Sequence, residues 1–234
     1  DKEGVSNARN TGMLAAKTDY LGFLDADDTF CKESVFFRMQ RLIDYDHDAV
    51  YCPTEIVDEN RDHLSWITSG NRENVTFLQM EGAPFHCNSL FIKRCLIPNF
   101  GLFDSEISNG EDWDFFQLLA RCGVVFWNVP EAKVQYVQHS KGTVFSDYNK
   151  HLMGLNDVLA KVYTYDDCGG YALEEYKDGF GSAHMRYRAN KRLWQGVLWN
   201  TLSGQDCAAK EISEAMWPHL TESITCREIE EMSR

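Results

Sequence analysis

The chain has 234 residues and a formal net charge of −13, with 44% hydrophobic and 25% charged residues. This length buries enough apolar surface for a large domain without a disulfide framework. The excess of 36 acidic over 23 basic residues argues against a protein that coats nucleic acid phosphates and against electrostatic docking on anionic lipid. A divalent cation can still supply positive charge locally for an anionic ligand.

The N-terminal part of the chain alternates predicted helices and strands. A helix is predicted over 6–17, with Ser6 as its N-cap. The apolar run 20–24 predicts a short strand buried on both faces, as in a parallel sheet. An amphipathic helix is predicted over 33–45 and a strand over 49–52, an alternation typical of an α/β domain. The apolar side of this second helix is expected to comprise Val35, Phe36, Met39, Leu42 and Ile43.

Further short strands are predicted in the middle of the chain, and helices in its C-terminal part. From residue 148 onward, apolar residues recur at helical spacing, with a loop near 166–170. We therefore expect one domain over 1–147 and a helical appendage over 148–234. The middle strands are expected at 54–58, 63–68, 74–79, 89–92, 124–129 and 133–137, and an aromatic-rich helix at 111–121.

Eight cysteines are spread along the chain, and no two of them form a C-x-x-C pair. This scatter argues against a zinc ribbon or a thioredoxin-type site and favours buried, reduced thiols. The corresponding interpretation is a cytoplasmic protein, with a secreted protein that carries some disulfides as the alternative. No apolar run approaches the roughly 20 residues needed to cross a bilayer.

The segment Asp25-Ala26-Asp27-Asp28 places three carboxylates directly after the first predicted strand. These carboxylates repel one another unless a positive charge lies among them. Open α/β sheets bind ligands outside the carboxyl ends of their strands, and carboxylate oxygens suit Mg²⁺ or Mn²⁺. The segment therefore predicts a metal site. The alternative is a solvated acidic turn that caps the next helix.

A second acidic segment, Glu111-Asp112-Trp113-Asp114, opens the predicted aromatic-rich helix. One of its carboxylates can take a proton from a hydroxyl nucleophile. Alternatively, the acids only stabilise the positive end of the helix. His139 follows an extended run and is a candidate ligand or a structural residue. Arg9-Asn10, near the start of the first helix, is a candidate anion site or plain surface.

Taken together, these segments resemble the family-2 inverting glycosyltransferases. Gly4-Val5-Ser6-Asn7-Ala8-Arg9-Asn10-Thr11-Gly12, followed by a helix and a strand that ends in D-x-D-D, is similar to the family's G-x-S-x-A-R-N-x-G stretch. Asn109-Gly110-Glu111-Asp112-Trp113-Asp114-Phe115 is similar to its acidic motif. Tyr136-Val137-Gln138-His139-Ser140 is similar to the segment in which many members carry a metal-binding histidine. The resemblance covers residues 1–145.

The resemblance implies an α/β fold of the GT-A type, which is Rossmann-like: a mixed sheet flanked by helices, with a helical C-terminal tail. It implies that Asp27 binds Mn²⁺ or Mg²⁺ directly. Asp25 would lie nearer the ribose of the donor or the water shell of the metal, and Asp28 would extend the motif. His139 would be a third contact to the metal or to the diphosphate.

The same resemblance assigns the remaining site residues. Asp112 would be the catalytic base, with Glu111 beside it, and Arg9 and Asn10 would lie at the donor side. The implied reaction is metal-dependent transfer of a sugar from a nucleotide-sugar, with UDP-sugar as the expected donor. The expected acceptor is a hydroxyl of a glycan or lipid-linked glycan, and the anomeric carbon inverts.

Family members normally begin with βα units that grip the nucleoside base. This chain starts at Asp1 without such a sequence, so we expect an N-terminally truncated GT-A domain. A further segment or chain would complete it, and one sheet edge would need a cover. The first alternative is a non-catalytic partner module that keeps only the acceptor half of the fold. A metal-dependent phosphohydrolase ranks last, because no second carboxylate and histidine set has hydrolase spacing.

Overall fold

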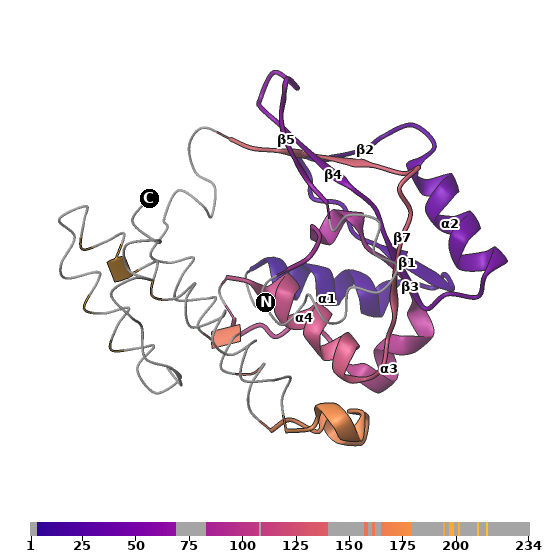
Figure 1. Ribbon diagram of the computed structural model, residues 1–234. Helices are drawn as coiled ribbons and strands as arrows, with labels where there is room; N and C mark the ends of the chain where they lie inside the picture. The colour runs from indigo at the N-terminus through magenta and orange to yellow at the C-terminus, as the bar shows by residue number, and fades with distance from the viewer. Residues whose placement is uncertain are drawn as a thin grey trace.

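The computed structural model describes residues 4–68, 83–107, 109–139, 157–158, 161 and 165–178, with single positions at 194, 197–198, 201, 210 and 214. In these residues the chain forms a mixed α/β structure with two small sheets (Figure 1). The predicted strand at 74–79 lies outside the described residues, as does most of the helical appendage predicted over 148–234. The predicted boundary between residues 147 and 148 also lies outside them, so the division into two domains stays a prediction.

The described elements follow the predicted order closely. The helices are α1 (Val5–Ala15), α2 (Ser34–Asp44), α3 (Ile97–Phe100) and α4 (Glu111–Arg121). The strands are β1 (Tyr20–Gly22), β2 (Thr29–Phe30), β3 (Ala49–Tyr51), β4 (Thr54–Val57), β5 (His63–Ile67), β6 (Phe91–Lys93), β7 (Phe126–Asn128) and β8 (Val134–Val137). The 3₁₀ turn η2 (Cys87–Ser89) precedes β6, and η3 (Arg94–Leu96) follows it. Two more 3₁₀ turns are η5 (Cys168–Gly170) and η6 (Glu174–Tyr176).

Both sheets mix parallel and antiparallel pairs. The first sheet has the order β1-β6-β3-β7, in which only β3 and β7 run parallel. The second has the order β2-β8-β4-β5, in which only β8 and β4 run parallel. The acidic segment 25–28 connects β1 of the first sheet to β2 of the second. This acidic segment therefore lies where the chain passes from one sheet to the other.

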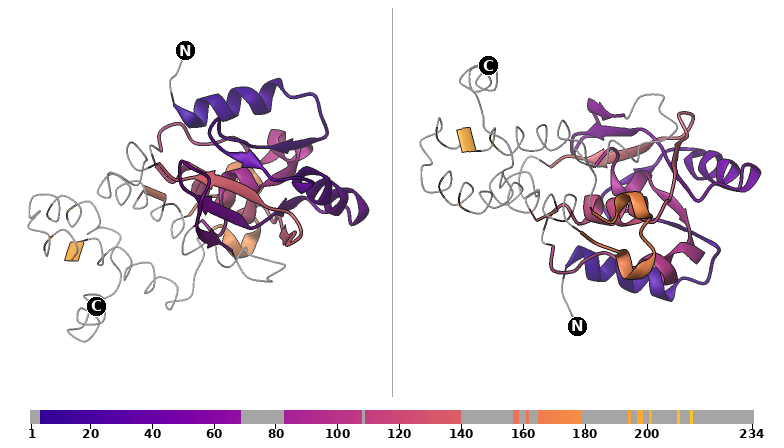
Figure 2. Two further views of the ribbon diagram at one scale, coloured as in Figure 1. Left: turned by 90° about the horizontal axis from the view of Figure 1, so that it is seen from above. Right: turned by 60° about the horizontal axis from the view of Figure 1, so that its bottom comes forward.

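The first sheet is buried on both faces, as its central strand β3 shows. Ala49 and Tyr51 face the cluster formed with α1 and α4, which includes Met13 and Phe116. Val50 and its neighbours on the other face pack on α2 through a second cluster. This alternation follows the period of two of a strand. Figure 2 shows α1 and α2 at the outside of the described part, with the N-terminus beside α1.

The buried face of α2 differs from the predicted one. Arg38 and Leu42 are buried, whereas Phe36 and Ile43 are 61% and 59% exposed. The Arg38 guanidinium lies over the ring of Phe91 at 3.8 Å and donates to backbone carbonyls. An arginine can thus occupy a core position when backbone carbonyls accept from two of its nitrogens and aromatic faces cover it. The prediction is therefore correct for Leu42 and Met39, which face the core, and wrong for Val35, Phe36 and Ile43, which are exposed.

Two further predictions about local structure are wrong. Helix α1 begins after Gly4, whose φ of 116° lets the chain turn into the helix, so Ser6 lies inside the first turn and is buried instead of capping it. Strand β1 pairs antiparallel with β6, and of its three residues only Leu21 is buried. A short apolar run shows that a strand is covered, but it does not reveal the direction of its partner.

A close approach of β1 and β6 leads to a stability prediction. Gly22 pairs with Phe91, and a Cβ at Gly22 would overlap the Phe91 ring. That ring is 6% exposed and packs against both Phe30 and Arg38, so it has little room to move. We expect Gly22→Ala to lower the free energy of unfolding by about 1–3 kcal/mol, the usual cost of overpacking. Urea denaturation measures this change.

The matched control for that variant is Gly12→Ala. Gly12 lies on the exposed side of α1, and a Cβ there meets nothing within 4 Å. This substitution is expected to raise the free energy of unfolding by about 0.5–1 kcal/mol, because glycine weakens a helix interior. Equal effects of the two variants would contradict the close packing of β1 on β6.

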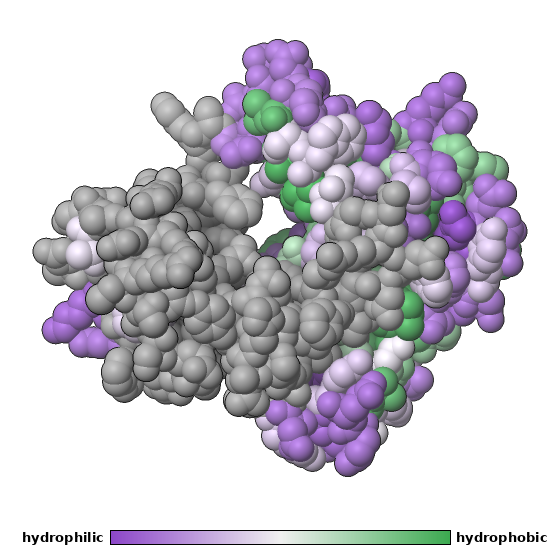
Figure 3. Space-filling view, in the orientation of Figure 1, coloured by the Kyte–Doolittle hydropathy of each residue, from purple (hydrophilic) through white to green (hydrophobic). Residues whose placement is uncertain are grey.

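The described residues contain no helix with the length and hydrophobicity needed to cross a membrane. The side of the molecule in Figure 3 is hydrophilic at the tip of the β4–β5 hairpin, at the top of that view. This tip, residues 58–62, reads Asp-Glu-Asn-Arg-Asp. Two of its charged side chains matter for the site, because Arg61 contacts the acidic segment that follows β1 and Glu59 contacts His139.

Candidate active site

The acidic segment forms a tight turn with Asp27 at its tip. The Asp28 amide donates to the Asp25 carbonyl at 3.1 Å and closes the turn. The Arg61 guanidinium, from the β4–β5 hairpin, donates to the Asp27 carbonyl at 3.1 Å. The Asp27 side chain remains 52% exposed. Hydrogen bonds to its backbone therefore hold the turn in place, while the half-exposed carboxylate of Asp27 is accessible to a ligand.

The side chain of Asp27 contacts that of His139. The Nε2 atom of His139 lies 2.8 Å from Oδ2 of Asp27, and its Nδ1 atom lies 3.6 Å from a carboxylate oxygen of Glu59. His139 follows β8 and Glu59 follows β4. Because β4 and β8 are parallel neighbours, their carboxyl ends meet at one edge of the second sheet. Topology thus brings together residues that are 112 positions apart.

Arg9 connects the acidic turn to the start of α4. From α1, its guanidinium contacts Asp25 at 3.2 Å and Glu111 at 2.8 Å, and it lies over the Phe103 ring at 5.4 Å. Burial by itself would lower the pKa of Arg9, but the surrounding negative groups, including both carboxylates, hold it above its usual value. Arg9 is thus a fixed cation between the two acidic segments.

Asp112 and Glu111 stand side by side at the start of α4. One Asp112 oxygen accepts a hydrogen bond from the Trp113 amide at 2.7 Å. Burial holds the pKa of both carboxyls above the usual value, although the charge of Arg9 partly opposes this shift. Asp114 points elsewhere, toward Lys161 at 3.2 Å. The carboxylates of this segment therefore have separate environments, and Asp112 is the one that no described side chain pairs at close range.

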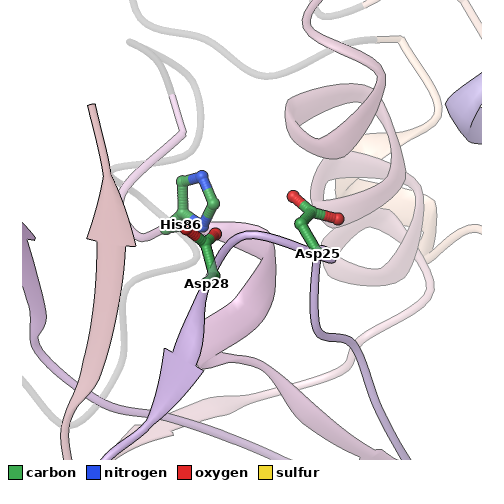
Figure 4. A group of neighbouring side chains, drawn as sticks. All are labelled: Asp25, Asp28 and His86. Carbon is green, nitrogen blue, oxygen red and sulfur yellow. The ribbon is translucent and has the colours of Figure 1, made fainter. Parts of the chain in front are cut away.

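A third group beside the turn had no sequence signal. His86, just before η2, lies within 4.8 Å of the carboxylates of Asp25 and Asp28, so these three residues could hold a metal ion. Figure 4 shows His86 beside Asp28, with Asp25 at the other end of the turn. Burial lowers the pKa of His86 to about 4 and raises that of Asp28 to about 6. No spacing rule joins residues 86 and 28, so the sequence analysis missed His86.

The side chain of Asn88 lies between the ends of the same turn, and the sequence analysis missed it too. Its amide donates to Asp28 and accepts from the Asp25 backbone N–H at 3.1 Å. The other oxygen of Asp28 accepts from the Val137 N–H at 2.8 Å. Asp28 is therefore engaged at both oxygens by protein donors.

Asn10, expected at the donor side, is engaged with the backbone of Phe103. Its side-chain amide donates to the Phe103 carbonyl at 2.8 Å and accepts from the Phe103 N–H at 2.9 Å. These two bonds tie α1 to the segment that precedes α4. Asn10 therefore keeps Arg9, its neighbour on α1, at a fixed distance from Glu111.

Comparisons with known proteins find glycosyltransferases. Residues 1–96 match the family model described as Glycosyl transferase family 2. An uncharacterized glycosyltransferase of Rickettsia felis is 25% identical over 162 residues, which are 68% of this chain and 26% of that protein. The Bacillus subtilis minor teichoic acid biosynthesis protein GgaB is 29% identical over 148 residues, which are 60% of this chain and 16% of that protein.

The chain thus spans about a quarter of the length of the Rickettsia relatives. Among solved structures, S. aureus TarS 1–349 in complex with UDP-GlcNAc is similar, with a TM-score of 0.59 and 14% sequence identity. The similarity covers 91% of this chain and 62% of the TarS chain. Residues 1–96 are thus similar to glycosyl transferase family 2, and the fold is of the GT-A type.

Proposed function

We propose that this chain is the catalytic part of an inverting, metal-dependent glycosyltransferase. It would move a sugar from a nucleotide-sugar, UDP-sugar first, to a hydroxyl of a glycan or lipid-linked glycan. The observation that carries the proposal is the contact of Arg9 with Asp25 and Glu111, because it holds two acidic segments together at one site. The UDP-GlcNAc in the TarS complex supports a UDP-sugar donor. The name of GgaB supports a cell-wall or similar glycan as acceptor.

Asp27 and His139 are the proposed metal ligands. Two adjacent ligands of an octahedral ion at about 2.1 Å lie about 3 Å apart, and the 2.8 Å between His139 Nε2 and Asp27 Oδ2 fits this spacing. A Mn²⁺ or Mg²⁺ ion at this position supplies positive charge for the departing nucleoside diphosphate. The carboxylate of Asp27 is the type of ligand that suits Mg²⁺ and Mn²⁺.

The group of Asp25, Asp28 and His86 is the weaker candidate for the ion. Arg9 already balances the charge of Asp25 at 3.2 Å. Both oxygens of Asp28 accept hydrogen bonds from the protein. The His86 Nδ1 atom accepts from the Asn88 N–H, which leaves the proton of the neutral ring on Nε2 and makes that atom a donor. We therefore assign Asp25 to the water shell of the metal or to the ribose.

Asp112 is the proposed base. Its carboxylate takes the proton of the acceptor hydroxyl as that oxygen bonds to the anomeric carbon, and the bond from this carbon to the diphosphate breaks. The base needs to be ionised and within hydrogen-bond reach of the acceptor. Glu111 is engaged by Arg9 at 2.8 Å, so it is less free to move to an acceptor. Asp112 thus carries the transfer and Glu111 supports Arg9.

The charge of Arg9 leads to a prediction for the pH dependence of turnover. Removal of this cation in Arg9→Met takes away the largest of the interactions that lower the pKa of Asp112, so that burial raises this pKa further. A base with a higher pKa is protonated, and therefore inactive, up to a higher pH. We expect the acid-side midpoint of the turnover profile to move to higher pH, as measured between pH 4.5 and 8.

The control for this profile is Arg41→Met. Arg41 lies on α2, contacts Glu131 at 3.9 Å and makes no described contact with the acidic segments. The Arg41→Met substitution removes the same positive charge from the chain and should leave the acid-side midpoint of the turnover profile unchanged. An unchanged midpoint in Arg9→Met would contradict the prediction that the charge of Arg9 lowers the pKa of the base.

The proposed function is tested by a donor screen on the intact protein. UDP-, GDP- and dTDP-sugars are added with Mn²⁺ or with EDTA, and the melting temperature is recorded. A donor at 100 times its dissociation constant adds about 2.7 kcal/mol, which raises Tm by about 5–10 °C for a chain of this size. We expect this rise with a UDP-sugar and Mn²⁺ only. No rise with any donor would contradict the proposal.

A further inference from the structure

We propose that Asn88 is the positioning residue of the acidic turn, and that Asp28 is its partner in a clamp. The amide of Asn88 holds both ends of the turn, and so fixes the direction in which the Asp27 carboxylate points. The part that concerns metal and donor binding rests on the proposed function; the clamp itself rests on hydrogen bonds within the chain.

The clamp joins the first and the last residue of the turn. Asn88 Oδ1 accepts from the Asp25 backbone N–H at 3.1 Å, and its Nδ2 donates to Oδ2 of Asp28. The turn itself is closed by the bond from the Asp28 N–H to the Asp25 carbonyl. The Asn88 side chain, 60 positions away in sequence from Asp28, thus bonds both ends of the turn. It leaves Asp27 at the exposed tip.

Asn88 is itself held from two sides. It is fully buried, and its carbonyl accepts from Nη1 of Arg38 at 3.1 Å. The Arg38 guanidinium lies between the rings of Phe30 and Phe91, at 4.5 and 3.8 Å. The Asn88 N–H donates to Nδ1 of His86. These contacts give a reason for the buried arginine of α2: Arg38 holds the backbone of Asn88, and Asn88 in turn holds the acidic turn.

The clamp also connects the turn to the other proposed metal ligand. Oδ1 of Asp28 accepts from the Val137 N–H at 2.8 Å, at the end of β8. His139 follows two residues later and contacts Asp27. Asn88 therefore fixes the position of Asp27. Through Asp28 it also fixes the end of β8, which His139 follows. Residues that orient metal ligands in this way typically change metal affinity by about 10- to 100-fold when they are replaced.

The test exchanges the two groups of the clamp. Asn88→Asp alone sets two carboxylates against each other. In the double variant Asn88→Asp with Asp28→Asn, residue 28 again donates an N–H to residue 88 and accepts from Val137, while residue 88 still accepts from Asp25. Every hydrogen bond of the clamp is restored and the net charge is unchanged. Ile92→Val is the control, because it trims a fully buried side chain of β6 whose strand partners, Leu21 and Ala49, lie outside the turn.

Two measurements on the intact protein separate the clamp from the proposed function. Amide hydrogen exchange of the peptide over 23–30 is expected to rise about 10-fold at Asp25 in Asn88→Asp, because the bond from residue 88 to Asp28 is lost and the repulsion between the two carboxylates moves residue 88 away from the Asp25 N–H. It should return to the wild-type value in the double variant and stay there in Ile92→Val. Mn²⁺ affinity in the presence of UDP is expected to fall about 10- to 100-fold in Asn88→Asp and to recover in the double variant.

Each outcome decides one part of the proposal. Exchange that stays slow in Asn88→Asp, or stays fast in the double variant, would overturn the clamp. Restored exchange with lost Mn²⁺ affinity in the double variant would make the Asp28 carboxylate a direct ligand and overturn its role as a clamp partner. Wild-type protein that binds neither Mn²⁺ nor UDP would contradict the proposed function, while the exchange data would still decide the clamp.

Discussion

Asp112→Asn is expected to lower the turnover of the donor by about 10²–10⁴, the usual contribution of a positioned base. The amide keeps the shape of the side chain but cannot take a proton from the acceptor. Affinity for the donor should change little, because Asp27 and His139, the proposed metal ligands, lie at another edge of the site. The measurement is the initial rate of UDP release, together with UDP affinity by calorimetry.

Glu111→Gln is the informative companion to this variant. Glu111 is 16% exposed and contacts Arg9 at 2.8 Å, so its loss should weaken that contact and reduce turnover much less than Asp112→Asn does. Near-normal turnover in Asp112→Asn with a collapse in Glu111→Gln would move the base to Glu111. Normal turnover in both would leave the acidic segment as a stabiliser of the start of α4.

Asp27→Asn is expected to abolish metal-dependent binding of UDP, which corresponds to a loss of at least about 100-fold in affinity. The amide removes the charge that attracts the ion, and it is a poor ligand for Mg²⁺ or Mn²⁺. The fold should be preserved, because the side chain is half exposed and the Arg61 contact is made to the backbone of residue 27. Titration of UDP in the presence of Mn²⁺ measures the effect.

Asp62→Asn is the matched control for charge. Asp62 is exposed on the β4–β5 hairpin, near the end of β4. The substitution removes the same negative charge from the vicinity of the turn and leaves Asp27 intact. UDP binding in the presence of Mn²⁺ should therefore match that of the wild type. Equal binding in Asp27→Asn and wild type would remove Asp27 from the metal site.

Elements defined by a local period were predictable from the sequence. The helix predicted over 111–121 coincides with α4, and the helix over 33–45 with α2 to within a residue at each end. The strand expected over 133–137 is β8. The order of four motifs indicated the family, and the family model matches residues 1–96. Local pattern and motif order thus carry most of the described fold.

What the sequence could not show depends on contacts between distant residues. Arg38 reads as the polar side of an amphipathic helix, yet it is buried against two aromatic rings. Asn88 lies outside every motif of the sequence, yet it contacts both ends of the acidic segment. Arg9 was expected to face the donor, and the structure shows it between Asp25 and Glu111. Such partners follow from topology, which no periodicity in the chain specifies.

The most direct test of the account is the configuration of the product. The intact protein is incubated with Mn²⁺ and the donor found in the screen, and the anomeric proton is followed by NMR. We predict that the donor is consumed only with the metal, that the first sugar product has the opposite anomeric configuration, and that Asp112→Asn stops the reaction. A product with the configuration of the donor, or a wild-type protein that consumes no donor in the presence of Mn²⁺, would contradict the account.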